Sequence, residues 1–215
     1  MTPGADTGRS AGPDPADGPA GTDGRQLRRE RNREAVVEAL LDLYHEGNLR
    51  PSTEEVATRS GLSPRSLFRY FDDVDDLTRT AMRRQQERVQ HLFPIDVPPH
   101  GPLDVKVAAL VDQRFRLYGA IGDAAVVARL RAPFQPVLAE QVRQNRALFR
   151  GQIGRLFAPE LTAMPGERGA WVLAAADVLT TFEACQQLTA DQGLTAEVAR
   201  TVLIEALKSL FRPSP

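Results

Sequence analysis

The sequence predicts an all-α protein of about nine helices. From Arg25 onward, apolar residues recur at helical spacing over almost the whole chain. Prolines and glycines gather between these stretches, where they interrupt helices. No segment alternates apolar and polar residues for long enough to indicate a strand. The length of 215 residues suits one large domain or two small ones.

The first 24 residues are expected to form a disordered tail. They hold six glycines, four prolines and four aspartates, and they contain no Val, Ile, Leu, Phe, Trp or Tyr. Such a segment has no apolar side chains whose burial offsets the entropy of ordering. The charge then changes sign, because residues 25–33 contain five arginines and only one acidic residue.

Residues 25–93 are predicted to form the first domain, with four helices. The first helix starts near Arg25 and ends before Gly47, and the second covers residues 53–60 and ends at Gly61. Ser63 and Pro64 open the third helix, as a hydroxyl cap followed by a first-turn proline. The acidic residues 72–76 open the fourth helix, which continues to about residue 93.

Residues 94–215 are predicted to form the second domain, after a proline-rich hinge near residues 94–102. Its helices are expected at residues 103–119, 123–131, 136–157, 167–190 and 195–211. The breaks between them fall at glycines and prolines, including all of residues 159–166.

Residues 52–71 have the pattern of a helix-turn-helix. Ala57 is small enough for the second helix to cross closely, and Gly61 relaxes the turn. Leu67, Phe68 and Phe71 are expected to anchor the second helix in the core. Arg65, Ser66 and Arg69 then face outward, and arginine is the residue type that reads guanine edges or clamps phosphates.

This stretch resembles the N-terminal domain of the TetR family of bacterial transcriptional regulators. The resemblance runs from about Arg33 to Leu77 and includes Ala57, Gly61 and Tyr70-Phe71. It implies a homodimer that binds palindromic operator DNA and a divergent C-terminal domain that dimerises and holds a small-molecule inducer. It implies no catalytic residues and no cofactor.

The resemblance also assigns DNA contacts by position. Phosphate contacts are implied at the start of the first helix and at Tyr70, and base contacts on the second helix. With two arginines of the basic segment added, the candidate DNA-binding residues are Arg28, Arg29, Ser52, Thr53, Ser63, Arg65, Ser66, Arg69 and Tyr70. The basic segment is equally explained as a solvated first helical turn.

Two departures from the family pattern stand out. Val74 replaces a lysine that binds the DNA backbone in many members, and the aspartates around it repel phosphate. The connection between Tyr44 and Val56 is also one residue shorter than usual.

The two last predicted helices are too apolar to be covered from one side only. The helix at 167–190 leaves only a narrow polar edge, and the helix at 195–211 has a broad apolar face. A dimeric four-helix interface explains both, and a central helix buried within a monomer is the alternative. The candidate interface residues are Trp171, Val178, Phe182, Val202, Leu203 and Leu210.

The candidate effector site lies among the helices of the second domain. Apolar residues with a few polar groups suit a largely apolar molecule oriented by one or two hydrogen bonds. The candidate residues are Leu110, Tyr118, Gln141, Asn145, Leu173, Asp177 and Thr181. Asp177 favours a cationic ligand if it faces the cavity ionised, or is simply a carboxylate bonded to a hydroxyl or an arginine. Anions fit less well, because Arg114, Arg116 and Arg146 are expected to reach solvent.

Other function classes find little support. The sequence has no nucleophile elbow, phosphate-binding glycine loop or HExxH motif, so we predict that the protein is not an enzyme. One cysteine and three scattered histidines give no metal site and no internal disulfide, which suits the cytoplasm. No apolar run reaches the roughly 20 residues of a membrane span.

The sequence therefore predicts a ligand-responsive, homodimeric transcriptional repressor that binds a palindromic operator. The alternatives are an activator or ligand-independent regulator that also binds DNA, and a helical interaction module without DNA binding. Val74 and the acidic residues beside it are the hints toward the last one.

Overall fold

The computed structural model describes residues 20–212, and their side chains from residue 24 onward. Within this range the protein has ten α-helices and no strand, so the all-α prediction is confirmed. The first four helices are α1 (Ala20–His45), α2 (Thr53–Ser60), α3 (Pro64–Leu67) and α4 (Val74–Val89). The other six are α5 (Leu103–Arg131), α6 (Pro136–Leu156), α7 (Ala158–Ala163), α8 (Arg168–Leu179), α9 (Phe182–Gln186) and α10 (Ala196–Phe211).

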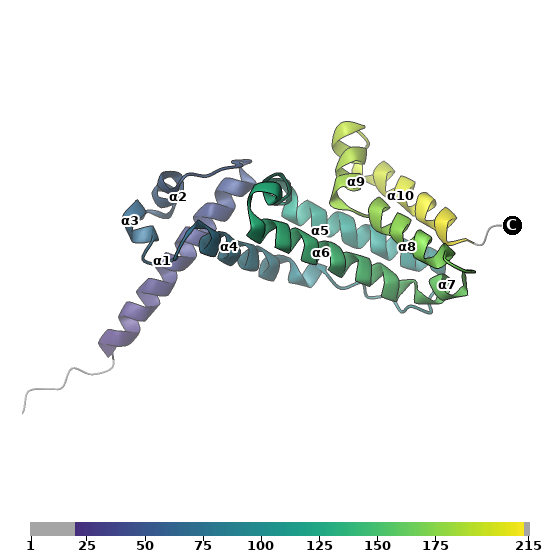
Figure 1. Ribbon diagram of the computed structural model, residues 1–215, viewed down its shortest axis with the longest axis horizontal. Helices are drawn as coiled ribbons and strands as arrows, with labels where there is room; N and C mark the ends of the chain where they lie inside the picture. The colour runs from purple at the N-terminus through teal and green to yellow at the C-terminus, as the bar shows by residue number, and fades with distance from the viewer. Residues whose placement is uncertain (1–19, 213–215) are drawn as a thin grey trace, which may run out of the picture.

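The helices surround two hydrophobic cores. In Figure 1, α2 and α3 lie beside the long α1 at one end of the molecule, and α5 and α6 run side by side toward the other end, where α7, α8 and α10 pack. The first core is built from α1 to α4 and also takes in Val127 from the end of α5. The second core is built from α5, α6 and α8 to α10. The last turns of α5 therefore belong to the group of helices that carries α2 and α3.

The first helix begins earlier than the sequence predicts. Residues 20–24 were assigned to a disordered tail, but α1 already starts at Ala20. That part of the prediction is wrong, and residues 1–19 lie outside the described range.

The predicted helix at 167–190 is broken into three pieces, which corrects the sequence reading. α8 ends at Leu179, α9 starts at Phe182, and a short π-helix follows over Gln187–Asp191. The break lies at two threonines. The Thr180 hydroxyl donates to the Ala176 carbonyl at 2.8 Å, and Thr181 caps α9 by accepting from the Ala184 amide at 3.1 Å. Local bonds of this kind compete with helix continuation, and apolar periodicity does not reveal them.

Two features of the fold reflect proline and glycine chemistry. α5 continues through the predicted break near residue 122, but it kinks there, because Gly122 adopts a φ of 30°. α7 forms inside the segment predicted to be a break, with Pro159 in its first turn, where the missing N–H costs nothing. None of the described helices is long and apolar enough to cross a membrane.

Candidate functional site

The helix-turn-helix is held by local capping. At the start of α2 the Ser52 hydroxyl accepts from the Glu55 amide at 3.2 Å, and the Ser52 amide donates to the Glu55 carboxylate at 2.7 Å. The hydrogen bond that the Ser52 amide donates to the carboxylate lowers the pKa of Glu55. Gly61 ends the helix at a φ of 71°, a left-handed conformation that suits glycine. Ala57 is 1 % exposed, as close helix crossing requires.

The second helix of the motif is only one turn long, with Arg65 on the helix and Arg69 in the turn that follows it. Ser63 caps α3, because its hydroxyl accepts from the Ser66 amide at 3.2 Å. Arg65 and Arg69 are both exposed, and neither has an ion pair with any described residue. Arg59 differs from them, because both its terminal nitrogens bind the Glu46 carboxylate at 2.8 Å. Arg65 and Arg69 are thus the cations of this motif that have no ion pair with the described residues and remain available to an external partner.

One core prediction for α3 is wrong. Leu67 and Phe71 are 2 % exposed, as expected, but Phe68 is 51 % exposed. α3 ends at Leu67, and Phe68 stands at its C-terminal cap. The shortness of the helix turns the Phe68 side chain away from the core.

Tyr70 occupies a partly buried position beside α1. Its hydroxyl accepts from the Asn32 side-chain amide at 2.9 Å, and the Arg69 guanidinium lies 6.0 Å from its ring centroid. Because the Asn32 amide donates this bond, the phenolic proton remains free for another acceptor. Tyr70 is therefore held in place by Asn32 and can still donate a hydrogen bond through its hydroxyl.

The basic segment of α1 divides into exposed and anchored residues. Arg28 and Arg29 are both exposed. They belong to the N-terminal half of α1, and the start of this helix extends away from the other helices (Figure 1). Arg33 instead donates to the Thr80 hydroxyl at 3.2 Å and lies 4.9 Å from the Phe71 ring centroid. Arg33 therefore fastens α1 to α4.

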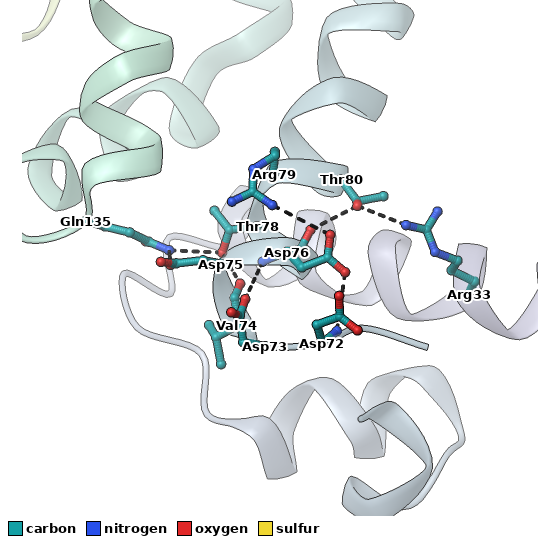
Figure 2. A network of polar contacts seen from close by, with 10 residues as sticks. All are labelled: Arg33, Asp72, Asp73, Val74, Asp75, Asp76, Thr78, Arg79, Thr80 and Gln135. Carbon is teal, nitrogen blue, oxygen red and sulfur yellow. Dashed lines mark hydrogen bonds and ion pairs between the residues drawn. The ribbon is translucent and has the colours of Figure 1, made fainter. Parts of the chain in front are cut away.

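The acidic residues 72–76 are largely engaged within the protein (Figure 2). Asp73 caps α4 through the Asp76 amide at 2.7 Å, and Asp76 lies 3.7 Å from Arg79. Asp75 accepts a 2.6 Å hydrogen bond from Gln135, which also donates to the Thr78 hydroxyl at 3.2 Å. Gln135 precedes α6, so the first turn of α4 is bonded directly to the start of α6.

A largely apolar cavity of about 130 Å³ lies where the two groups of helices meet. α1 and α4 contribute to its wall together with α5, α6 and the α8–α9 junction. Five predicted effector-site residues line it, namely Tyr118, Gln141, Asn145, Asp177 and Thr181. Two do not, which corrects their assignment: Leu110 is fully buried in the second core, and Leu173 packs against that core near Gly154.

One end of the cavity carries charge that the sequence did not indicate. Glu183 accepts from Arg129 at 3.0 Å and from Arg146 at 2.7 Å, and all three residues line the cavity. Partial desolvation opposes ionisation, but a backbone hydrogen bond and the two arginines lower the pKa of Glu183 overall. Asp177 lies 3.5 Å from Arg150. Arg129 and Glu183 are 54 positions apart, so no local pattern could reveal this pair.

Arg114 departs from the expectation that it reaches solvent, whereas Arg146 does reach solvent as expected. Arg114 is 1 % exposed and donates to the side chains of Gln113 and Gln152 and to the Phe149 carbonyl. Burial lowers its pKa, and its Nε atom has no hydrogen-bond partner among the described residues. Arg146 has an exposed side chain, yet it lines the cavity. Tyr118 donates to the Thr180 carbonyl at 2.8 Å, and burial raises its pKa.

The predicted dimer residues separate into exposed and buried ones. Trp171 and Val178 on α8 are 66 % and 65 % exposed, and Val202 on α10 is 43 % exposed. Leu210 is partly buried against the second core. Phe182 and Leu203 are 5 % and 3 % exposed within the single chain, so they belong to its own core and not to an interface. The exposed residues leave an apolar face on two helices that pack against each other.

The sequence matches no protein-family model and no curated protein sequence. Solved structures do match. A transcriptional regulator from Rhodococcus sp. Rha1 aligns with a TM-score of 0.63 and 17 % identity, over 85 % of this chain and 95 % of its own. A TetR-family regulator from Streptomyces coelicolor aligns with a TM-score of 0.63 and 21 % identity, over 84 % and 80 %.

A third neighbour is the multidrug-binding protein EbrR in complex with imidazole. It aligns with a TM-score of 0.51 and 22 % identity, over 87 % of this chain and 96 % of its own. These similarities extend over both groups of helices, beyond the residues that carry the sequence resemblance. The chain therefore has the fold of the TetR-family transcriptional regulators.

Proposed function

We propose that this protein is a ligand-responsive, homodimeric transcriptional repressor that binds palindromic operator DNA. Residues 25–93 form its DNA-binding domain, and residues 94–215 its effector-binding and dimerisation domain. The observation that carries the proposal is the outer surface of the helix-turn-helix, where Arg65 on α3 and Arg69 in the turn after α3 are exposed and free of ion pairs with the described residues. Bidentate arginine contacts to guanine are the commonest specific contact in the major groove.

The surroundings of α3 supply phosphate-contact candidates. Tyr70 keeps a proton free for a phosphate oxygen, and Ser52 and Thr53 lie at the N-terminus of α2, where backbone amides favour anions. Ser63 and Ser66 at the start of α3 offer hydroxyls beside the arginines. Arg28 and Arg29 on the projecting part of α1 provide additional positive charge for the adjacent DNA backbone.

The acidic residues 72–76 argue less against DNA binding than the sequence suggested. Asp73, Asp75 and Asp76 are bonded to a helix N-terminus, to Gln135 and to Arg79. Their charge is thereby partly offset within the protein. This weakens the case for an interaction module that does not bind DNA.

The effector response is proposed to act through the cavity. Its wall includes Tyr44 on α1 and Met82 on α4 together with residues of α5 and α6, so a ligand there touches both groups of helices. Such a ligand shifts the equilibrium between two dimer arrangements only by its different affinity for each. The imidazole complex of the neighbouring multidrug-binding protein supports small-molecule binding by this fold.

The test is selection of a preferred sequence from random duplexes, followed by binding measurements on alanine variants. An inverted repeat is expected, because a two-fold dimer presents two identical α3 helices. Arg65→Ala and Arg69→Ala are each expected to lose about 1–3 kcal/mol, or roughly 5- to 150-fold in affinity. Arg143→Ala, on an exposed arginine paired with Glu140 on α6, is the matched control.

Two results would contradict the proposal. One is selection of no sequence at all, with affinity that only follows the salt concentration. The other is unchanged operator affinity in both the Arg65 and the Arg69 variants. Transcription from a promoter carrying the selected site then distinguishes a repressor from an activator.

A further inference from the structure

The cavity combines an apolar chamber with a charged end. Phe93, Leu117, Leu138, Val142 and Phe149 supply apolar surface to the chamber. The charged residues Arg129, Arg146, Asp177 and Glu183 also line the cavity. A ligand that fills this space must match both parts.

Both carboxylates of the charged end are already paired. Glu183 uses one oxygen to accept from Arg129 at 3.0 Å and from Arg146 at 2.7 Å. Asp177 lies 3.5 Å from Arg150 on the adjacent turn of α6. Asp177 therefore already has a cationic partner within the protein, so its place in the cavity lining does not by itself call for a cationic ligand.

Guanidinium groups, by contrast, exceed carboxylates around the cavity. Arg129 and Arg146 line the cavity with the two carboxylates, and Arg150 pairs with Asp177 from outside the lining. A fourth arginine, Arg114, lies next to the lining residue Phe149, with its guanidinium 4.5 Å from that ring centroid. Hydrogen-bond partners of Arg114 are neutral oxygens, and its Nε atom has none within the described part of the chain. The surroundings of the cavity therefore carry uncompensated positive charge.

The arginines that line the cavity also keep donors to spare. A guanidinium has five N–H donors. Arg146 uses its Nη2 nitrogen toward Glu183, and Arg129 uses Nε toward Glu183 and Nη1 toward the Ala125 carbonyl. A carboxylate at this end of the cavity would accept charge-assisted hydrogen bonds from donors that the protein leaves free.

We infer that the effector is a small monocarboxylate with an apolar body, which enters the chamber while its carboxylate binds Arg146 and Arg129. This inference rests on the proposed ligand response and names the chemical class of the ligand. The cavity of about 130 Å³ limits the apolar body to about one aromatic ring or a short alkyl chain, since a dry cavity of about 150 Å³ holds benzene.

The test is calorimetric titration of the full chain with phenylacetate, phenylacetamide and phenethylamine, which share one ring and differ in charge. Hexanoate and hexanamide form a second pair with an alkyl body. At least one acid is expected to bind at least about tenfold tighter than its amide, as a hydrogen bond to a charged group allows. The amine is expected not to bind.

Variants locate the binding group. Arg146→Gln is expected to reduce acid affinity at least about tenfold and to leave amide affinity unchanged. Arg143→Gln, on the same helix outside the cavity lining, is the control and should bind as the unmodified protein does. Circular dichroism of both variants checks that they are folded.

The inference is overturned if both amides bind as tightly as their acids, if the amine binds more tightly, or if neither acid binds. Release of operator DNA is measured separately. An acid that binds through Arg146 without affecting the operator complex would contradict the ligand response and leave the ligand class standing. Release by a neutral or cationic compound alone would overturn the class and leave the proposed function standing.

Discussion

The exposed apolar face of α8 and α10 gives a direct test of dimerisation. Trp171 is the largest side chain on this face and is 66 % exposed in the single chain. Val178 follows it two helical turns later on α8, and Val198 and Val202 lie one turn apart on α10. If this face pairs with a second copy, Trp171→Ala removes its central anchor.

The magnitude follows from the exposed area. A tryptophan side chain buries up to about 250 Å², so two thirds of it leaves about 165 Å² for a partner to cover. At about 25 cal/mol per Å², this area sets an upper limit of about 4 kcal/mol per protomer. Truncation of an interface tryptophan typically costs about 2 kcal/mol or more. Because a two-fold interface contains the residue twice, the dimer should lose about 4 kcal/mol, or roughly a thousandfold in Kd.

The assay is sedimentation across a concentration series, with thermal melting as a second measurement. Phe134→Ala is the control, because Phe134 is 88 % exposed on the turn between α5 and α6 and lies outside this face. Leu203→Ala should behave differently, lowering the free energy of unfolding by about 2–5 kcal/mol, since Leu203 is buried in the chain itself. An undiminished dimer in Trp171→Ala would place the interface elsewhere.

Three further predictions concern charge. Arg28→Gln and Arg29→Gln should each lower the slope of log affinity against log salt by about 0.9 if the arginine contacts a phosphate, and an unchanged slope would show that these residues are only solvated. Glu160→Ala should lower the free energy of unfolding, measured in urea, by about 3–5 kcal/mol, because it leaves the 1 % exposed Lys106 side chain without its carboxylate. Lys106→Met should lower it less, since the Glu160 side chain is 21 % exposed and can be hydrated. The reverse order of the two variants would refute this reasoning. Burial raises the pKa of the Cys185 thiol from 9.0 to about 11. The thiol therefore ionises first in the unfolded chain, and the free energy of unfolding should fall as pH rises between these values. Cys185→Ala should reduce that loss, and an identical pH profile in the variant would contradict this explanation.

Local chemistry made much of the helix-turn-helix part predictable. Ser52, Gly61 and Ser63 mark helix ends by capping and by left-handed backbone geometry, which are properties of a few adjacent residues. Helical periodicity likewise indicated the buried side of α1 and the outward position of Arg65 and Arg69. The sequence reading failed at Phe68, because its exposure depends on where a very short helix stops.

The cavity and the exposed face depended on tertiary structure. Periodicity identified α8 and α10 as broadly apolar, but it could not distinguish a side chain packed in its own core, such as Phe182 or Leu203, from one left on the surface, such as Trp171. The reason is that hydrophobic burial is non-directional and does not depend on which chain provides the covering surface.

The arrangement of charged residues at the cavity also depended on the tertiary structure. Arg129, Arg146 and Glu183 come from three helices, and their pairing over 37 and 54 positions follows from how those helices pack. Sequence alone determined the all-α class, the helix-turn-helix and its outward arginines, because these follow from contacts between near neighbours in the chain. Only the tertiary structure decided which arginines are buried and which carboxylates are paired, because those properties are set by distant segments that share one small space.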